Sequence, residues 1–195
     1  MSAPSRPSRM RLARAAAGTA AFLVLAPGVV GGLVPWWLTG WRAHDVWLPA
    51  RAAGALLLVG GAAALLLSFA RFVVEGIGTP APAAPTERLI VGGLYRHVRN
   101  PMYLAVAATI IGQALLLGRP VLVAYASAFA VAVAAFVHGY EEPTLARRFG
   151  DQYRAYRSAV PAWLPRPHAW NGENAPAAGQ RPDGARPHHR RKPRG

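Results

Sequence analysis

Residues 102–137 read MYLAVAATIIGQALLLGRPVLVAYASAFAVAVAAFV, and Arg119 is the one charged residue in this stretch. Gly118-Arg119-Pro120 divides it into two apolar runs, 102–117 and 121–137. Glycine ends helices and proline starts them, so this spacing predicts a hairpin of two helices joined by a tight turn. Each arm would be roughly 24–26 Å long at 1.5 Å per residue, which suits a thin or locally pinched bilayer.

Two further apolar runs precede the hairpin. Residues 15–38 carry no charge, and residues 52–74 carry only Arg71. Each run is longer than the roughly 20 residues that cross a bilayer core. A cleaved signal peptide is the alternative for the first run, but that run ends in Pro35-Trp36-Trp37 instead of small residues. These tryptophans, with Trp41 and Trp47, are typical of an interfacial belt. We therefore predict an all-α, polytopic membrane helix bundle with about four transmembrane helices.

The net charge of +14 lies mostly in the two ends of the chain. Residues 1–14 carry four arginines and no acid, and residues 166–195 carry six arginines and Lys192 against Glu173 and Asp183. We expect residues 1–14 to be a basic cytoplasmic tail and residues 166–195 to be a disordered basic tail. Such tails favour anionic lipid headgroups, and no nucleic-acid partner is expected. The arginine distribution predicts an integral, multi-pass protein of the cell membrane with both termini in the cytoplasm.

Two segments outside the apolar runs have their own patterns. Residues 79–85 are rich in proline, which favours an extended connection between the pair of helices in 15–75 and the region 76–165. The hairpin, taken as 102–140, is followed by an apolar stripe at 4-4-3 spacing formed by Leu145, Phe149, Tyr153 and Tyr156. This stripe predicts an amphipathic helix over 143–158, starting at Pro143 and lying on the membrane or against the bundle.

Polar residues gather where the two arms of the hairpin begin and end. Before the first arm lie Tyr95, Arg96, His97, Arg99 and Asn100, and Pro101 and Tyr103 begin it; after the second arm lie His138, Tyr140, Glu141 and Glu142. Because a tight turn joins the arms, these groups must be neighbours. We expect Arg99 and Asn100 to face Glu141 and Glu142. Arginine beside glutamate and tyrosine can bind a zwitterionic ligand, with the carboxylate on Arg, the ammonium on Glu and a ring on Tyr.

Simpler explanations exist for each residue taken alone. Arg96 and Arg99 could anchor the topology, and Glu141 and Glu142 could favour a helix N-terminus at Pro143. Tyr103 and Tyr140 could be interfacial residues. The joint arrangement is harder to explain in these ways, because two adjacent carboxylates at a membrane boundary are costly without partners. With no cysteine in the chain, disulfides, thiolate metal sites and cysteine nucleophiles are excluded, and we predict no metal site.

The string Gly93-Leu94-Tyr95-Arg96-His97-Val98-Arg99-Asn100-Pro101-Met102-Tyr103 resembles the signature of the isoprenylcysteine carboxyl methyltransferase and phospholipid methyltransferase superfamily. The resemblance continues in order through Glu141-Glu142-Pro143-Thr144-Leu145, Phe149-Gly150, Tyr153, Tyr156 and Val160-Pro161-Ala162-Trp163-Leu164-Pro165. It covers about residues 79–165, so the region 76–165 is expected to be the catalytic, methyltransferase-like part of the chain.

This resemblance implies an integral membrane enzyme that transfers a methyl group from S-adenosylmethionine to a lipophilic acceptor. In this superfamily the cofactor lies in a cytoplasm-facing pocket built by the last two spans and the C-terminal segment, and the acceptor enters from the lipid. The implied catalytic residues are Arg99 and Glu142. The implied cofactor-binding residues are Tyr95, Arg99, Asn100, Pro101, Tyr103, Glu141, Glu142 and Tyr153. Methyl transfer needs alignment, desolvation and, for an amine acceptor, a base; it needs no metal.

The chain departs from the carboxyl methyltransferase branch at Asn100, where that branch usually has histidine. Prenylated-cysteine acceptors are therefore less favoured, and the acceptor group stays open between carboxyl and amine. Two other functions are compatible with the sequence. One is a membrane reductase of the sterol type that uses a nicotinamide cofactor, and the other is a non-catalytic membrane assembly protein or small transporter subunit in which Arg99 and Glu142 form an inert structural pair.

Overall fold

The computed structural model describes residues 21, 25–75 and 89–172. Helices and helical turns make up its regular structure, and no strand occurs among these residues, which confirms the all-α prediction. The elements in order are η1 (Val29–Leu33), α2 (Val34–Thr39), α3 (Leu48–Glu75), η2 (Gly93–Arg96), α4 (Pro101–Leu117), α5 (Pro120–Phe136), η3 (Val137–Glu141) and α6 (Glu142–Ala159). Two of the short turns, η1 and η3, are π-helical, and η2 is a 3-10 turn.

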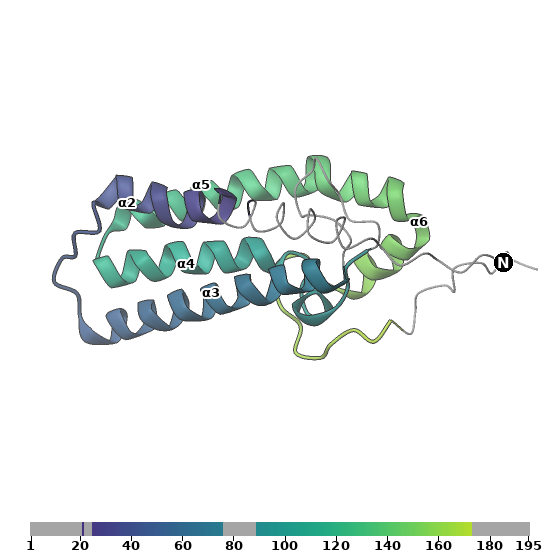
Figure 1. Cartoon of the computed structure of the whole chain (residues 1–195), viewed down its shortest axis with the longest axis horizontal. Coiled ribbons are helices and arrows are strands. Elements are labelled where there is room, and N and C mark those ends of the chain that lie inside the picture. Colours follow the sequence, from purple (N-terminus) through teal and green to yellow (C-terminus); the bar gives the residue numbers. More distant parts are fainter. Residues whose placement is uncertain (1–20, 22–24, 76–88, 173–195) are drawn as a thin grey trace, which may run out of the picture.

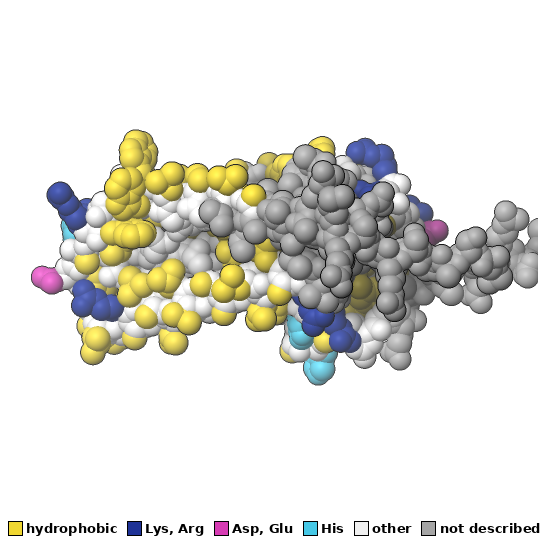
Figure 2. All heavy atoms as spheres, viewed as in Figure 1, with side chains coloured by type: hydrophobic (Ala, Val, Ile, Leu, Met, Phe, Trp, Pro, Cys, Tyr) yellow, Lys and Arg dark blue, Asp and Glu magenta, His cyan; other side chains and the backbone are white. Residues whose placement is uncertain are grey.

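Helices α2 to α5 lie along the long axis of the molecule and α6 covers one end of the bundle (Figure 1). Two helical stretches, Leu48–Arg71 and Pro120–Ala159, are long and apolar enough to cross a membrane, and Leu25–Thr39 and Pro101–Leu117 are shorter apolar helices. Apolar side chains lie along the visible surface of the bundle, while Arg and His side chains lie toward its ends (Figure 2). The chain is therefore a membrane helix bundle. Of the first predicted span, 15–38, the structure describes residue 21 and residues 25–38.

Helices α3 and α4 approach each other closely because glycines line their contact. A Cβ atom added at Gly61 would lie 2.8 Å from the Ala105 carbonyl oxygen, and one at Gly112 would lie 2.7 Å from the Leu58 nitrogen. Atoms do not pack at such distances, so these positions admit only hydrogen. Small residues at helix contacts are the usual means by which membrane helices gain van der Waals contact, since lipid gives no hydrophobic driving force between them.

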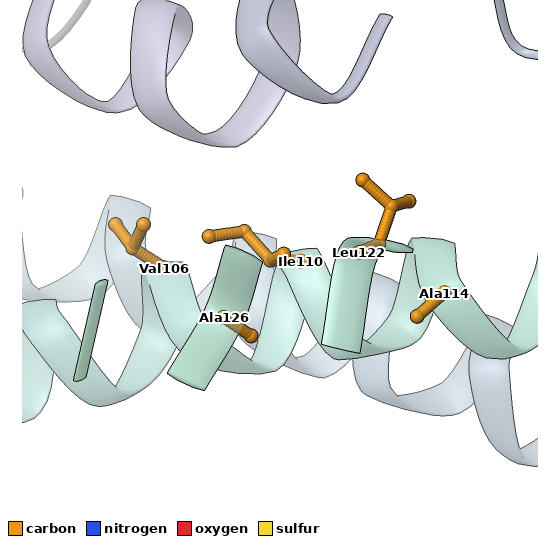
Figure 3. Close-up of a cluster of buried hydrophobic side chains, with 5 residues drawn as sticks. All are labelled: Val106, Ile110, Ala114, Leu122 and Ala126. Carbon is orange, nitrogen blue, oxygen red and sulfur yellow. The ribbon is translucent and has the colours of Figure 1, made fainter. Parts of the chain in front are cut away.

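The predicted hairpin of α4 and α5 is confirmed, with its turn at the predicted residues. Gly118 ends α4 in the left-handed conformation with φ of 61°, its N–H donates to the Ala114 carbonyl, and Pro120 begins α5. Side chains from the two helices meet in a buried cluster (Figure 3). Its members are Val106, Ile110, Ala114, Leu122 and Ala126, of which Ile110 and Leu122 are fully buried.

The first apolar helix is attached to the hairpin by polar side chains. Gln113 Nε2 donates to the Gly31 carbonyl at 2.7 Å, and the Tyr125 hydroxyl donates to the Val30 carbonyl at 3.0 Å. Both acceptors belong to the π-turn η1, where the widened backbone departs from the regular helical ladder. These two hydrogen bonds satisfy the polar ends of Gln113 and Tyr125 and fix this helix against α4 and α5.

The amphipathic helix predicted over 143–158 is present as α6, with Pro143 in its first turn, but it is not separate from the hairpin. Helix α5 continues through η3 into α6, and the break falls at Gly150, whose φ is 52° and ψ is −125°. The π-helical hydrogen bonding of η3 accommodates Pro143, which has no N–H to donate to a regular ladder. Gly150 supplies the bend, since a positive φ is unfavourable for other residues. The second half of the helix then turns back toward the bundle, and it ends near Val160-Pro161 as predicted.

The prediction of a disordered tail from Arg166 onward is also wrong for its first residues. Segment 166–172 follows an irregular path and is held against the turn before α4 by backbone hydrogen bonds. This order arises from backbone pairing and from the packing of a single apolar side chain, Trp170, and neither forms a periodic pattern in the sequence. The basic N-terminal residues 1–14, the proline-rich connection at 79–85 and the remaining tail 173–195 lie outside the described residues.

Neighbouring glycines of α3 provide a test of the close helix contact. We expect Gly61→Ala to lower the free energy of unfolding by about 1–3 kcal/mol, because its methyl group would overlap the backbone of α4. Gly60→Ala is the matched control, since nothing lies within 4 Å of its Cβ position. It should leave stability unchanged or raise it by up to about 1 kcal/mol through helix propensity. Thermal unfolding in detergent, followed by tryptophan fluorescence, measures both. Equal effects of the two substitutions would contradict the close contact.

Candidate functional site

The segment that precedes α4 is bound to the C-terminal end of the described chain. The Arg99 N–H donates to the Pro161 carbonyl at 2.9 Å, and the Trp170 N–H donates to the Arg96 carbonyl at 3.0 Å. Between these, the Arg166 N–H donates to the His97 carbonyl at 2.9 Å. Segment 160–171 therefore runs beside residues 96–100 and encloses the end of the bundle at which α6 lies.

Arg99 and Glu142 form a nearly buried ion pair at this end. Arg99 Nη1 lies 2.5 Å from Glu142 Oε1, and the two side chains are 11% and 5% exposed. The Arg99 guanidinium also donates through Nη1 to the Tyr153 hydroxyl at 3.2 Å and through Nε to the Val160 carbonyl at 2.9 Å. The contact predicted between Arg99 and Glu142 is thus present. Arg99 also connects the start of α4 to the second half of α6, through Tyr153, and to the chain that follows, through Val160.

Glu142 has two further partners on its own helical run. Arg157 Nη2 lies 3.2 Å from Glu142 Oε2, and His138 Nδ1 lies 3.4 Å from the same oxygen. Arg157 and His138 are 53% and 58% exposed, in contrast to Glu142. The bend at Gly150 brings Arg157 back to Glu142, because the two residues lie on opposite sides of it.

The neighbouring carboxylate has a different environment. The Tyr103 hydroxyl donates to Glu141 Oε2 at 3.1 Å, and both residues are half-buried. This bond joins α4 to the π-turn η3. Glu141 is therefore held by a neutral donor, whereas Glu142 is held by two guanidinium groups.

The charges of these neighbours do not cancel locally. Arg99 and Arg157 carry two formal positive charges against the one negative charge of Glu142, whereas Glu141 is bonded to the neutral hydroxyl of Tyr103, and burial raises the pKa of the Glu141 carboxyl. One excess positive charge and one excess negative charge on adjacent groups match a ligand that carries both a carboxylate and an ammonium.

Three tyrosines predicted from the pattern are buried behind the ion pair. Tyr95, Tyr153 and Tyr156 are 7%, 2% and 3% exposed, and the Tyr156 hydroxyl donates to the Tyr95 carbonyl at 2.7 Å. Trp170 packs on Tyr156 with ring centroids 5.4 Å apart. Burial raises the pKa of the Tyr95 hydroxyl well above its ordinary value, so the phenol stays neutral. The stripe of α6 therefore faces the bundle, one of the two placements expected.

Asn100 and Pro101 define the start of α4. Pro101 is the first helical residue, which suits its fixed φ and missing N–H. Asn100 is 7% exposed, and its side-chain amide donates to the Ala162 carbonyl at 3.2 Å. The asparagine that departs from the carboxyl methyltransferase pattern thus contacts the C-terminal segment, a contact made by an uncharged donor.

Three residues of the site were not among the predicted binding residues, although Arg96 and His138 were among the polar residues expected at this end of the hairpin. His138 and Arg157 both contact Glu142, and Arg96 donates through Nε to the Trp170 carbonyl at 2.6 Å. Spacing gave a signal for His138, which is four residues before Glu142 and therefore on the same helical face. Arg157 had no such signal in its spacing, because only the bend at Gly150 brings its side chain to Glu142.

Comparison with known protein families gives one match. A sequence model described as phospholipid methyltransferase matches residues 49–152, which is more than half of the 195 residues. The match runs from the start of α3 into α6 and includes Arg99, Glu141 and Glu142, but it ends before Tyr153 and Arg157. Comparisons with curated proteins and with solved structures give no match.

The buried ion pair predicts a large effect of a small substitution. We expect Glu142→Gln to lower the free energy of unfolding by roughly 3 kcal/mol, because it leaves two guanidinium groups without their counter-charge. Amide hydrogen exchange in segment 160–171 should become faster, since Arg99 anchors that segment.

The exposed pair on the same helix serves as the control. Asp151 and Arg154 lie 2.5 Å apart with side chains 75% and 66% exposed, so Asp151→Asn should change stability by less than about 1 kcal/mol. Thermal unfolding and hydrogen exchange in detergent measure both variants. A Glu142→Gln protein as stable as Asp151→Asn would show that the ion pair does not hold this end together.

Proposed function

The chain belongs to the phospholipid methyltransferase family, and on this premise we propose that it is an S-adenosylmethionine-dependent methyltransferase that acts on a lipophilic acceptor in the bilayer. Membership implies a membrane methyltransferase. The observation that carries the finer proposal is the pair of unbalanced charges at the Arg99–Glu142 and Tyr103–Glu141 contacts. The amino-acid part of S-adenosylmethionine has the same two charges.

The residues present fit this cofactor, and each takes a role set by its partners. Glu141 would receive the ammonium, because its partner is a neutral hydroxyl; burial raises the pKa of the Glu141 carboxyl, and a bound ammonium would offset that effect. Arg99 and Arg157 would receive the carboxylate, because one Glu142 carboxylate serves both. In this proposal Arg99 and Glu142, the residues expected to be catalytic, act by fixing the cofactor in place.

The remaining predicted residues would form the wall of the cofactor site. Tyr103 aligns Glu141, and Pro101 sets the start of the helix that carries Tyr103. Tyr95, Asn100 and Tyr153 are buried, so they would support the wall from behind. Bound there, S-adenosylmethionine supplies a methyl group already activated by a positive sulfur. The protein then has to exclude water and align the acceptor, which the packed end of the bundle favours.

Lipid can reach the bundle directly, which supports an acceptor that resides in the membrane. Exposed apolar side chains lie on both long helices, at Leu56, Val59, Leu66 and Leu67 of α3 and at Val121, Val123, Val131 and Phe136 of α5. Trp36, Trp37, Trp41 and Trp47 are exposed near the other end of the bundle from α6, as an interfacial belt requires. We propose that the α6 end faces the cytoplasm, with both termini on that side and the basic tails near anionic lipid.

Glu141 provides a binding test of this proposal. We expect Glu141→Gln to weaken S-adenosylmethionine binding by roughly 10- to 100-fold, because a charge-assisted hydrogen bond to the ammonium is lost. Folding should be unaffected, since Tyr103 can donate to the amide oxygen. Isothermal titration calorimetry in detergent measures the affinity, and Asp45→Asn, an exposed carboxylate before α3, is the control. Affinity equal to that of the control would remove Glu141 from the cofactor site.

Labelled methyl transfer tests the activity itself. We expect protein in lipid vesicles to move a radioactive methyl group from S-adenosylmethionine into the lipid-soluble fraction, and heat-denatured protein to move none. The alternative reductase predicts a different pattern. Tight binding of a reduced nicotinamide, together with no binding of S-adenosylmethionine or its demethylated product, would contradict the proposal and favour that function.

A further inference from the structure

The outward face of α6 carries more positive than negative charge. Its exposed charged side chains are four arginines and one acid, namely Arg147, Arg148, Arg154, Arg157 and Asp151. Asp151 is paired with Arg154, so the other three arginines have no exposed counter-charge on the helix. The apolar stripe of α6 packs against the bundle and leaves this face to the surroundings. A surface with this charge attracts a negatively charged partner.

Arg147 and Arg148 have no carboxylate partner among the residues that the structure describes. Arg147 Nη2 donates to the Thr144 hydroxyl at 3.3 Å, and Arg148 Cζ lies 5.5 Å from the centre of the Phe149 ring. Both contacts are with neutral groups, so neither guanidinium has its charge balanced. A guanidinium can donate two parallel hydrogen bonds to a phosphate, and two adjacent arginines therefore suit phosphate oxygens.

The length of the helix brings this pair to the depth of lipid headgroups. The helix covers about 40 Å from Pro120 to Arg147 at 1.5 Å per residue. Pro120 lies at the end of the bundle opposite to α6, where the exposed tryptophans are also found (Figure 1). A hydrocarbon core is roughly 30 Å thick, so with Pro120 at one boundary Arg147 lies about 10 Å beyond the other. That is the layer of the lipid phosphates.

The bend at Gly150 returns the remaining arginines to this layer. A straight helix would carry Arg157 about 15 Å further along the axis than Arg147. Instead the chain turns back, and Arg157 Nη2 lies 3.2 Å from Glu142 Oε2, although Glu142 precedes Arg147 on the helix. The bend therefore keeps the positive charge of α6 near the membrane surface instead of extending it into the water.

We propose that Arg147 and Arg148 of α6 bind the phosphate groups of anionic lipids in the leaflet at this end of the bundle. An anionic lipid is preferred to a zwitterionic one, because no ammonium in its headgroup balances the phosphate. A lipid is preferred to a soluble polyanion, because the pair lies at the depth of the headgroups. Neither arginine belongs to the proposed cofactor site, so the inference does not depend on methyl transfer.

A fluorophore beside the two arginines measures the local lipid composition. The chain has no cysteine, so Gln152→Cys, an exposed position four residues after Arg148, gives one attachment site for bimane. The labelled protein is placed in phosphatidylcholine vesicles that contain a small fraction of doxyl-labelled phosphatidylglycerol or of doxyl-labelled phosphatidylcholine. We expect phosphatidylglycerol to quench the fluorophore about threefold more strongly or better. At 1 M salt the preference should disappear, since charges are then screened beyond about 3 Å.

Substitutions on the same helix test which charges attract the lipid. In Arg147→Gln/Arg148→Gln the quenching ratio should fall to about 1.5 or less, because both unbalanced charges are lost. Arg147→Lys/Arg148→Lys is the matched control and should keep most of the preference, because it keeps both charges. Asp151→Asn should strengthen the preference, because Arg154 loses its counter-charge. Thermal unfolding in detergent should be unchanged in all of these variants, since the altered side chains are exposed.

Three results would overturn the inference. The first is equal quenching by the two lipids in the labelled protein that carries no further substitution. The second is an unchanged preference in Arg147→Gln/Arg148→Gln, which would assign the lipid to other charges of the chain. The third is binding of a labelled oligonucleotide to the protein in pure phosphatidylcholine vesicles, lost in the same variant, which would assign the surface to a nucleic acid.

Discussion

The ion pair between Arg99 and Glu142 is the interaction on which the end of the bundle depends. A charge with about a tenth or less of its side chain exposed needs a partner, because an unpaired charge in such surroundings would cost several kcal/mol. Arg99 satisfies Glu142 and also bonds to Tyr153 and Val160. One guanidinium thereby fixes the beginning of α4, both sides of the bend in α6 and the chain beyond. The Arg99–Glu142 ion pair therefore specifies this geometry more than it adds to the stability of the folded state.

Arg99 and Glu142 lie at the same depth in the bundle because the two helices of the hairpin have equal length. Helices α4 and α5 each contain 17 residues and are joined by a tight turn, so the start of one lies level with the end of the other. Glycine contacts hold α3 against α4, which leaves the hairpin little freedom to slide. The π-turn η3 then leads from α5 to Glu141 and Glu142. Glu141 contacts Tyr103 there, and Glu142 contacts Arg99. The packing of α3, α4 and α5 thus determines where the charged residues of the site lie.

Features governed by local chemistry were predictable from the sequence, and features governed by distant backbone pairing were not. The hairpin, the Arg99–Glu142 contact and the buried stripe of Tyr153 and Tyr156 follow from apolar runs, Gly118 and helical spacing. The π-turn has no residue signature, and a glycine such as Gly150 within a helical pattern indicates only a modest propensity cost. Segment 166–172 has no apolar periodicity, and it is held by backbone bonds to residues 96 and 97 and by the packing of Trp170 on Tyr156.

The family match covers most of the charged residues of the site but not most of the groups that hold them in position. Residues 49–152 include the charges proposed to bind the cofactor, apart from Arg157. The groups that position those charges come largely from beyond the match: Tyr153, the carbonyls of Val160, Pro161 and Ala162, and Trp170. Backbone carbonyls can hold Arg99 and Asn100 whatever side chains the segment carries. The position of the charged groups therefore depends on the path of the C-terminal backbone more than on the side chains of that segment.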